Sequence, residues 1–202
     1  MHAPRDPAEI WSEFKKLLKP GRIAYDVGAN YGDVAIELAD YFEKVYAFEP
    51  CDESYNGLCL LNNARVVPVH KAVSDHDGTT ELYVMSNSIQ TGQLTSEVGG
   101  PSWGWMLGKR TVPCVKLDTF ATEHGYPDMI KIDTEGGELR VLLGAIEVLK
   151  RKPTLYIEVH NSQNGEQIIP LVKHYNEIRI LRHPYYEPLS HNWWNHYFII
   201  CR

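Results

Sequence analysis

The sequence lacks the features that mark membrane proteins, disulfide scaffolds and nucleic-acid-binding proteins. No apolar run approaches the ~20 residues needed to cross a bilayer, and residues 1–6 lack the charged and apolar regions of a signal peptide. The four cysteines show no CxxC spacing, so neither structural zinc nor a disulfide framework is indicated. The formal net charge of -6 argues against binding to duplex nucleic acid, which requires positive charge. We therefore expect a cytoplasmic protein with no nucleic-acid or membrane partner.

The composition is that of an ordinary folded chain. Apolar residues make up 44% and charged residues 23% of the sequence, which is typical of globular domains. We find no internal repeat, low-complexity tract or linker, and 202 residues fit one domain. Residues 1–202 are therefore interpreted as a single domain, with a leading helix within residues 1–20.

Short apolar runs alternate with amphipathic segments along most of the chain. Apolar residues at helical spacing predict helices, and short apolar runs predict strands. The predicted helices are 8–18, 33–42, 52–63, 138–150 and 166–175, and the predicted strands are 23–27, 45–48, 66–69, 80–85, 111–117, 129–132, 154–159, 178–181 and 197–201. This alternation predicts a doubly wound α/β fold with a mostly parallel sheet. Residues 86–109 are polar and rich in glycine, which predicts a long, lid-like loop.

A glycine-containing loop follows the first predicted strand. The sequence Asp26-Val27-Gly28-Ala29-Asn30-Tyr31-Gly32 lies at the carboxyl end of that strand, where open α/β sheets bind ligands. The GxGxxG pattern of dinucleotide sites is incomplete, because Asn30 and Asp33 occupy its second and third glycine positions. The Asp33 carboxylate would meet a pyrophosphate at the start of the helix. A nicotinamide or flavin dinucleotide is therefore disfavoured.

Glu49 ends the second predicted strand at the position where an acidic side chain accepts hydrogen bonds from ribose hydroxyls. This indicates a nucleoside without requiring a phosphate. S-adenosylmethionine fits, because its cationic sulfonium suits an acidic pocket formed by Asp26, Glu49 and Asp133. For Asp26 alone, a loop or capping hydrogen bond is the alternative.

Four segments carry a resemblance to a known family. They are the Asp26–Gly32 loop, Val45–Pro50 with its Phe48-Glu49-Pro50 ending, Lys71–Asp75 with Gly78 following, and Ile130–Glu138. Together they resemble the FkbM-type S-adenosylmethionine-dependent methyltransferases over residues 23–160. The resemblance implies a Rossmann-like class I methyltransferase fold, with a seven-stranded sheet whose last strand is antiparallel. It also implies O-methyl transfer to a hydroxyl group of a sugar, glycan or small natural product.

The resemblance further implies which residues contact the cofactor. The glycine loop would line its methionine end, Glu49 would bind the ribose, and the segment after the third strand would border the adenine. The residues implied are Asp26, Gly28, Ala29, Asn30, Tyr31, Gly32, Glu49, Pro50, Lys71, Ala72 and Val73. Plain packing is the alternative for Ala72 and Val73, and a solvated surface position is the alternative for Lys71.

Candidate catalytic groups follow the strands predicted at 129–132 and 154–159. Methyl transfer to a hydroxyl is an in-line displacement that needs alignment and removal of a proton. Asp133 is expected at the methyl acceptor, and His160 is the most suitable base because its unperturbed pKa lies near 6.5. Glu158, which faces the same side as His160, would orient the imidazole or accept the proton itself.

Two further interpretations concern the same segment. Oxygen and nitrogen donors of this kind can hold a divalent cation that lowers the pKa of the acceptor, although a metal is not favoured. Glu135 is explained equally well as an N-cap or first-turn carboxylate of the helix starting near Gly136, and Glu138 by the helix dipole.

Aromatic residues in two segments are candidates for the acceptor site. They are Trp103, Trp105, Tyr185, Tyr186, Trp193 and Trp194, and the last pair is interleaved with His191, Asn192, Asn195 and His196. Flat apolar faces beside polar groups suit a sugar, and packing is the alternative. Two other functions compete with methyl transfer: a nicotinamide-dependent oxidoreductase, and a non-catalytic module that binds a nucleoside or glycan.

Overall fold

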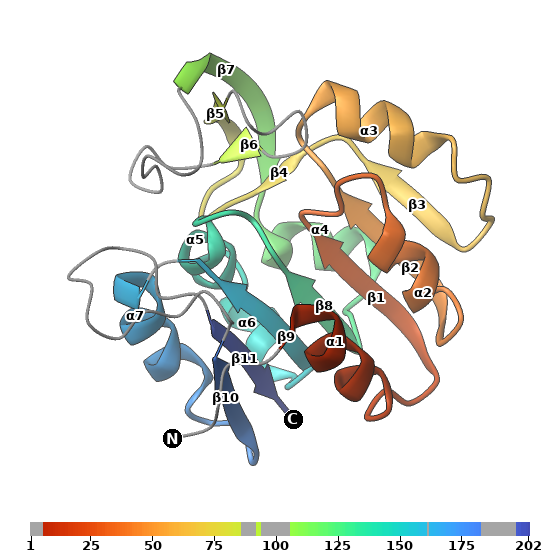
Figure 1. The fold of residues 1–202 in the computed structure, drawn as a ribbon, viewed down its shortest axis with the longest axis vertical. Coiled ribbons are helices and arrows are strands. Elements are labelled where there is room, and N and C mark those ends of the chain that lie inside the picture. The colour runs from red at the N-terminus through yellow and green to blue at the C-terminus, as the bar shows by residue number, and fades with distance from the viewer. Residues whose placement is uncertain (1–5, 86–91, 94–105, 161, 183–196) are drawn as a thin grey trace.

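The structure of the chain, a computed structural model, describes residues 6–85, 92–93, 106–160, 162–182 and 197–202 (Figure 1). Its helices are α1 (Pro7–Lys15), α2 (Asp33–Leu38), α3 (Asp52–Cys59), α4 (Leu117–His124), α5 (Glu138–Leu143), α6 (Ile146–Lys150) and α7 (Ser162–Val172). Its strands are β1 (Gly21–Val27), β2 (Phe42–Phe48), β3 (Val66–Val69), β4 (Ala72–Val73), β5 (Gly78–Met85), β6 (Gly92–Gln93), β7 (Met106–Val115), β8 (Met129–Ile132), β9 (Thr154–Val159), β10 (Ile178–Arg182) and β11 (Tyr197–Cys201). None of the helices in these ranges has the length and apolarity needed to span a membrane.

The main sheet contains seven strands in the order β10-β11-β9-β8-β1-β2-β3. β1 pairs in parallel with β2 and β8, and β8 pairs in parallel with β9. β11 runs antiparallel to both of its neighbours, β9 and β10. The predicted doubly wound α/β sheet, mostly parallel with an antiparallel last strand, is confirmed.

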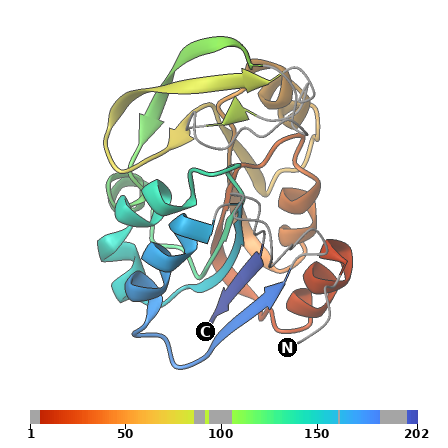
Figure 2. The same cartoon turned by 60° about the vertical axis from the view of Figure 1, so that its left-hand side comes forward.

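Helices cover both faces of this sheet (Figures 1 and 2). One core cluster joins alternate strand residues to α4, α5, α6 and α7, and the other joins the intervening residues to α1, α2 and α3. Tyr25 and Val27 of β1 belong to the first cluster, whereas Ala24 belongs to the second. This alternation is the period-two pattern of strands buried on both faces, which is why they appear in the sequence as continuous apolar runs.

The leading helix α1 is shorter than the predicted segment 8–18. Asp6 caps it by accepting a hydrogen bond from the backbone N–H of Ala8 at 2.7 Å, and Pro7 occupies its first turn. Ile10 and Phe14 are fully buried against the sheet. The helix therefore covers one face of β9 and β11, and the ring centroids of Phe14 and Tyr156 lie 4.9 Å apart.

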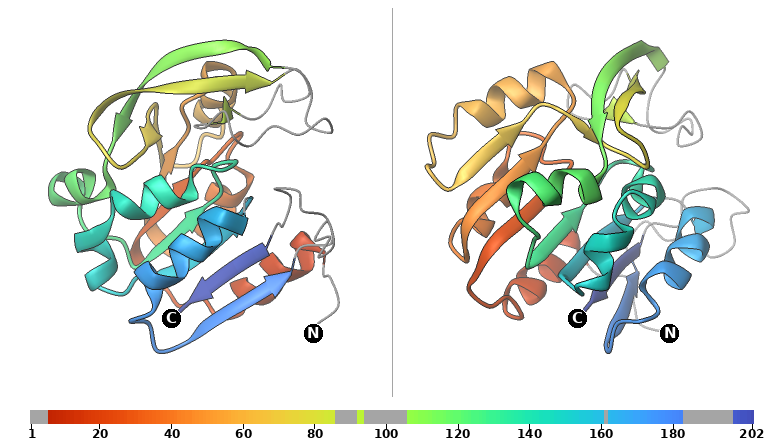
Figure 3. Two further views of the ribbon diagram at one scale, coloured as in Figure 1. Left: turned by 90° about the vertical axis from the view of Figure 1, so that its left-hand side faces the viewer. Right: turned by 180° about the vertical axis from the view of Figure 1, so that it is seen from behind.

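A second sheet of four strands, in the order β4-β7-β5-β6, lies beyond the carboxyl ends of β1 and β2 (Figures 1 and 3). β5 and β7 pair antiparallel, and β4 pairs in parallel with β7. Residues 92–93 and 106–109, predicted as part of a continuous loop over 86–109, belong to strands β6 and β7. That part of the prediction is wrong, and the remaining residues of the lid-like segment lie outside the described part of the chain.

The helix predicted over 138–150 is two helices, so the single-helix prediction is wrong. The break falls at Gly144, where a Cβ atom would lie 2.1 Å from the carbonyl oxygen of Ser74. α6 then starts afresh because the Asp118 carboxylate accepts hydrogen bonds from the backbone N–H groups of Glu147 and Val148 at 2.9–3.1 Å. Asp118 belongs to α4, a helix that the sequence did not predict.

Candidate active site

Polar side chains gather at the carboxyl ends of adjacent parallel strands. Because side chains on a strand alternate between faces, residues two apart share a face. Three apolar strand residues, Ala24, Met129 and Tyr156, pack under the layer formed by α1, α2 and α3. Two residues after each of them, on the same face of the sheet, come Asp26, Lys131 and Glu158. The polar groups of β1, β8 and β9 therefore continue this apolar face to the edge of the sheet where open α/β folds bind ligands.

The loop after β1 needs glycine at position 28. The backbone N–H groups of Gly28 and Ala29 donate to the carbonyl of Phe48 at 3.1 and 2.9 Å, which folds the loop over the end of β2. Gly28 has a φ of +78°, and a Cβ atom there would lie 1.8 Å from the carbonyl oxygen of Asp133. Only glycine combines this backbone conformation with so close an approach. Gly28 thus brings the predicted cofactor loop against the segment that carries Asp133.

The end of the same loop packs on α3. Gly32 has a φ of +91°, and a Cβ atom there would lie 2.5 Å from a methyl carbon of Leu58. The ring of Tyr31 lies over Gly57, where a Cβ atom would come within 2.3 Å of it. These contacts give Tyr31 and Gly32 a packing role, and their contact with a cofactor stays a prediction.

Glu49 is a buried carboxylate held by the backbone. Its Oε2 accepts a hydrogen bond from the N–H of Asn30 at 2.9 Å, and its Oε1 accepts one from the N–H of Cys51 at 2.8 Å. Its residue is 5% exposed, and burial raises its pKa to about 7, against the lowering effect of these two hydrogen bonds. Each oxygen keeps one acceptor position, so the carboxylate suits a pair of neighbouring hydroxyl groups. Pro50 follows it and is half-buried.

Two other buried acceptors stand beside Glu49. The Oδ1 atom of Asn30 and both carboxylate oxygens of Asp26 are buried and accept no hydrogen bond within the described residues, although Asp26 Oδ1 forms an ion pair with Lys131 Nζ at 3.3 Å. Burial of such acceptors costs free energy unless a donor reaches them. Hydroxyl and ammonium donors of an adenosyl amino acid would satisfy them, so the residues present fit the predicted cofactor.

Lys131 is a site residue that the sequence analysis missed. Its Nζ donates to the carbonyl of Gly28 at 2.8 Å and lies 3.3 Å from carboxylate oxygens of both Asp26 and Asp133. Burial lowers the pKa of Lys131, but the two carboxylates outweigh it and raise the pKa above its ordinary value. Burial raises the pKa of Asp26, because it disfavours the charged carboxylate, and the nearby Lys131 partly opposes this increase. The lysine therefore ties the β1 loop to the β8 loop.

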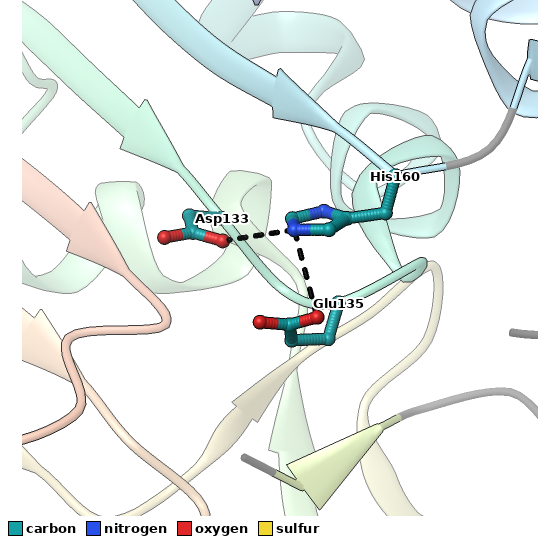
Figure 4. Close-up of side chains that lie close together, drawn as sticks. All are labelled: Asp133, Glu135 and His160. Atoms are coloured by element: carbon teal, nitrogen blue, oxygen red, sulfur yellow. Dashed lines mark ion pairs between the residues drawn. The ribbon is translucent and has the colours of Figure 1, made fainter. Parts of the chain in front are cut away.

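His160 lies among carboxylates that come from the ends of β8 and β9. Its Nε2 atom lies 3.6 Å from Asp133 Oδ1 and 3.5 Å from Glu135 Oε2 (Figure 4). Glu158 Oε1 lies 3.8 Å from the same nitrogen. The structure therefore brings together the three residues predicted to be catalytic, Asp133, Glu158 and His160, and adds Glu135 to them.

Glu138 has a different surrounding from the one expected. It does start α5, as a helix-dipole role requires, but it is fully buried. Its Oε1 accepts a hydrogen bond from the N–H of Gly136 at 2.8 Å and lies 3.1 Å from His160 Nδ1. Glu135 is not the N-cap of this helix, because Gly137 occupies that position. The interpretation of Glu135 as the N-cap of this helix is therefore wrong, whereas Glu138 does lie in the first turn of α5 and contacts His160 as well.

The crowding of carboxylates changes the protonation of this cluster. Burial lowers the pKa of His160, but Glu135 and Glu138 outweigh it, so the pKa lies well above 6.5. Burial, together with the nearby Asp133, raises the pKa of Glu158 to about 8. The expectation that an ordinary pKa near 6.5 suits His160 as a base therefore does not hold for this environment.

The residues predicted to border the adenine form the start of the second sheet. Ala72 and Val73 make up β4, are 2% exposed and belong to core clusters, whereas Lys71 is exposed. Packing and a surface position therefore account for them, and cofactor contact stays a prediction. The aromatic and polar residues predicted to contact the acceptor, at positions 103, 105, 185–186 and 191–196, lie outside the described residues.

Comparison with known proteins identifies the family. A family model described as the methyltransferase FkbM domain matches residues 26–187. The chain belongs to the FkbM methyltransferase family. This membership favours methyl transfer over the nicotinamide oxidoreductase considered from the sequence.

Relatives of this FkbM-family chain include an enzyme with a stated substrate class. Hexuronic acid methyltransferase AglP from Haloferax volcanii is 23% identical over 158 residues, which cover 74% of this chain. The match covers 61% of AglP, so the chain spans about three fifths of the length of that relative.

Solved structures show the class I methyltransferase fold. Methyltransferase FkbM from Methylobacillus flagellatus superimposes with a TM-score of 0.64 and 19% identity, over 98% of this chain and 48% of its own. An rRNA methylase from Streptococcus thermophilus superimposes with a TM-score of 0.55 and 14% identity, over 98% of this chain and 97% of its own. At these identities the likeness concerns the fold alone.

Proposed function

We propose that this protein is an S-adenosylmethionine-dependent O-methyltransferase whose acceptor is a hydroxyl group of a sugar, a glycan or a small natural product. Family membership supports methyl transfer. The observation that carries the cofactor assignment is the Glu49 carboxylate, which two backbone N–H groups hold at the end of β2 with acceptor positions to spare.

The cofactor site extends from Glu49 along the β1 loop. Glu49 would accept hydrogen bonds from the ribose hydroxyls, and Asn30 and Asp26 offer buried oxygens to the amino acid end. The two pairs of charges in Asp26–Lys131–Asp133 keep the loops after β1 and β8 in register. S-adenosylmethionine supplies an electrophilic methyl group on a cationic sulfur, which an acidic site favours.

The acceptor site lies at the ends of β8 and β9. Asp133 is 30% exposed at its side chain, whereas His160 is 3% exposed, so Asp133 reaches furthest toward an entering molecule. Asp133, Glu158 and His160 would position the hydroxyl and take its proton as its oxygen attacks the methyl carbon. Alignment of the hydroxyl beside the methyl group would supply most of the acceleration.

A sugar acid is the acceptor class we put first. The support is AglP, a relative described as acting on hexuronic acid. An FkbM domain alone leaves the acceptor open, so neutral sugars and small natural products belong in any test panel.

The test is methyl transfer from isotope-labelled S-adenosylmethionine to a panel of uronic acid glycosides and their neutral counterparts, followed by mass spectrometry. We expect a labelled methyl group on a hydroxyl oxygen of at least one uronic acid acceptor. Transfer to nitrogen or carbon only would contradict O-methylation, and cofactor binding without turnover across the panel would favour the non-catalytic binding module.

A matched pair of variants links the activity to the site. Asp133→Asn should lower the turnover number by about two orders of magnitude while leaving the affinity for S-adenosylhomocysteine nearly unchanged. Asp40→Asn, at an exposed aspartate after α2, is the control and should keep full activity. Equal activity in both variants would remove Asp133 from the acceptor site.

A further inference from the structure

The cluster around His160 contains donors of two chemical kinds from two strand ends. Asp133 and Glu135 follow β8 and His160 follows β9, and one ligand atom from each lies within 4.8 Å of the other two (Figure 4). Two ligand atoms bound to one divalent cation at about 2.2 Å are separated by roughly 3.0–3.6 Å. The distances of 3.6 Å and 3.5 Å from His160 Nε2 to Asp133 Oδ1 and Glu135 Oε2 fall in this range.

A buried oxygen in the same cluster has no hydrogen-bond donor among the described residues. This oxygen is Glu135 Oε2, and Figure 4 shows its carboxylate turned toward the imidazole of His160. At 3.5 Å from His160 Nε2 this oxygen forms an ion pair with the imidazole rather than a hydrogen bond, and the spacing allows both atoms to bind one cation that lies to the side of the line between them. A buried carboxylate oxygen is costly unless a cation or a donor reaches it, so this oxygen points to a ligand.

The far side of the imidazole is already fixed. His160 Nδ1 lies 3.1 Å from Glu138 Oε1, and that oxygen also accepts hydrogen bonds from the backbone N–H groups of Thr134 and Gly136, at 3.3 and 2.8 Å. Glu138 is therefore anchored, and it favours the tautomer with hydrogen on Nδ1. Metal-binding histidines usually have one ring nitrogen held by a carboxylate in this way, which leaves the other nitrogen, here Nε2, to face the metal.

Carboxyl groups are crowded around this point. Four carboxylates, those of Asp133, Glu135, Glu138 and Glu158, lie within 4 Å of His160 ring nitrogens, and Lys131 Nζ pairs with Asp133 on its other side. A divalent cation would neutralise part of the negative charge of these carboxylates in a site that excludes most water.

We propose that Asp133, Glu135 and His160 bind a divalent transition-metal cation, with Glu138 as the positioning residue that orients His160. The imidazole favours a transition-metal cation over Mg²⁺, which prefers oxygen donors alone, and the two carboxylates also suit Mn²⁺, which serves as a paramagnetic probe of the site. Glu158, 3.8 Å from His160 Nε2, is left to accept a proton.

The role of the cation in catalysis rests on the proposed function, whereas its binding does not. A cation at this point would lower the pKa of an acceptor hydroxyl and bridge it to a neighbouring oxygen of a sugar acid. The hydroxyl oxygen would form the bond to the methyl carbon, the cofactor sulfur would keep the electron pair of the broken bond, and the proton would go to Glu158. The cation would also offset the repulsion between an anionic acceptor and the carboxylates.

The direct test is titration of the chelator-treated protein with Mn²⁺, followed by electron paramagnetic resonance, with and without S-adenosylhomocysteine. We expect one Mn²⁺ per chain. Glu135→Gln should weaken the Mn²⁺ affinity by about tenfold or more, and Glu138→Gln by roughly 10–100-fold through loss of orientation. The control pair is Glu123→Gln and His124→Asn, an exposed glutamate and histidine on α4, which should bind Mn²⁺ as the unmodified protein does.

Several outcomes would overturn the proposal. Absence of Mn²⁺ binding in both conditions, or equal binding in all four variants, would exclude the site. Circular dichroism checks that each variant folds. Asp133→Asn, at the more exposed ligand, replaces any variant that does not. Methyl transfer that continues unchanged in a chelator would exclude the catalytic role and leave the proposed function intact, whereas Mn²⁺ binding with no transfer to any acceptor would leave the metal site intact and contradict the function.

Discussion

The sharpest prediction concerns the protonation of Glu49. Its pKa of about 7 in the free protein lies above the value of 4.5 for an unperturbed glutamate, because burial disfavours the charged form. Ribose hydroxyls donate to the ionised carboxylate, so the cofactor binds the form that is populated above pH 7. Affinity for S-adenosylhomocysteine should therefore fall as the pH drops below 7, by up to tenfold per pH unit, and level off above pH 8.

Glu49→Gln should abolish this pH dependence and lower the affinity at pH 8. A side-chain amide has one oxygen where the carboxylate has two, so one of the backbone N–H groups of Asn30 and Cys51 loses its acceptor, and this cost lowers the stability of the free and the bound protein alike. The affinity falls because the ribose hydroxyls lose hydrogen bonds to a charged carboxylate, each of which contributes about 1.5–3 kcal/mol. We expect an affinity loss of about 3 kcal/mol, which is roughly a hundredfold.

The same shift has a consequence for stability with the opposite sign. A carboxyl group with a raised pKa in the folded state stabilises the protein fully below pH 4.5, and the contribution is lost as the pH rises to about 7. The full effect for Glu49 is about 3 kcal/mol, because one pKa unit corresponds to about 1.4 kcal/mol. The cofactor-free Glu49→Gln variant should therefore lose less stability than the unmodified protein between pH 5 and pH 7.

Isothermal titration calorimetry tests the binding part directly. Titrations in two buffers of different ionisation enthalpy should reveal proton release on binding near pH 6.5 in the unmodified protein and none in Glu49→Gln. Glu43→Gln, at an exposed glutamate on the same strand, is the control. The same pH dependence in the Glu49 variant, or an unchanged affinity at pH 8, would refute the ribose assignment.

Two further predictions concern the loops that meet beside Glu49. Gly28→Ala should lower the free energy of unfolding by about 2–4 kcal/mol and weaken cofactor binding, because the added Cβ would overlap the carbonyl oxygen of Asp133. The control is Gly78→Ala, where φ is +126° but no atom lies within 4 Å of the added Cβ, so only the backbone effect should remain. Equal losses of unfolding free energy in the two variants, measured by urea denaturation, would contradict this explanation. Lys131→Met should lower the free energy of unfolding by about 3–5 kcal/mol at neutral pH, because it leaves the buried Asp26 without its ion pair. This loss should become smaller at low pH, where Asp26 takes up a proton. A loss of unfolding free energy that does not change with pH in the same assay would argue against the ion pair.

Much of the site could be predicted because its residues end strands. Asp26 lies near the end of β1, whereas Glu49, Asp133 and His160 each directly follow a strand, and parallel strands bring their carboxyl ends to one edge. Order along the chain was enough to group them.

Lys131 was missed for a physical reason. It lies inside the run Met129–Ile132, where alternation places a lone lysine at a solvated position by default, and its burial depends on Asp26 and Asp133 on other segments. A lysine inside a strand buried on both faces was the available signal, since such strands otherwise contain apolar residues throughout. The contact of Glu138 with His160 was not predicted either, because it depends on how α5 packs on β9.

The second sheet also escaped prediction. β5 and β7 are joined by a long connection with no short turn to mark a hairpin, and β4 is only two residues long. The break at Gly144 depends on the carbonyl of Ser74, a contact between distant segments that helical periodicity does not record.

A crystal structure with bound S-adenosylhomocysteine would test the central claim most directly. We expect both ribose hydroxyls to donate to the Glu49 carboxylate and the amino acid end to lie along the loop from Asp26 to Gly32. A nucleoside found at another edge of the sheet, or one at this edge whose ribose makes no contact with Glu49, would contradict it.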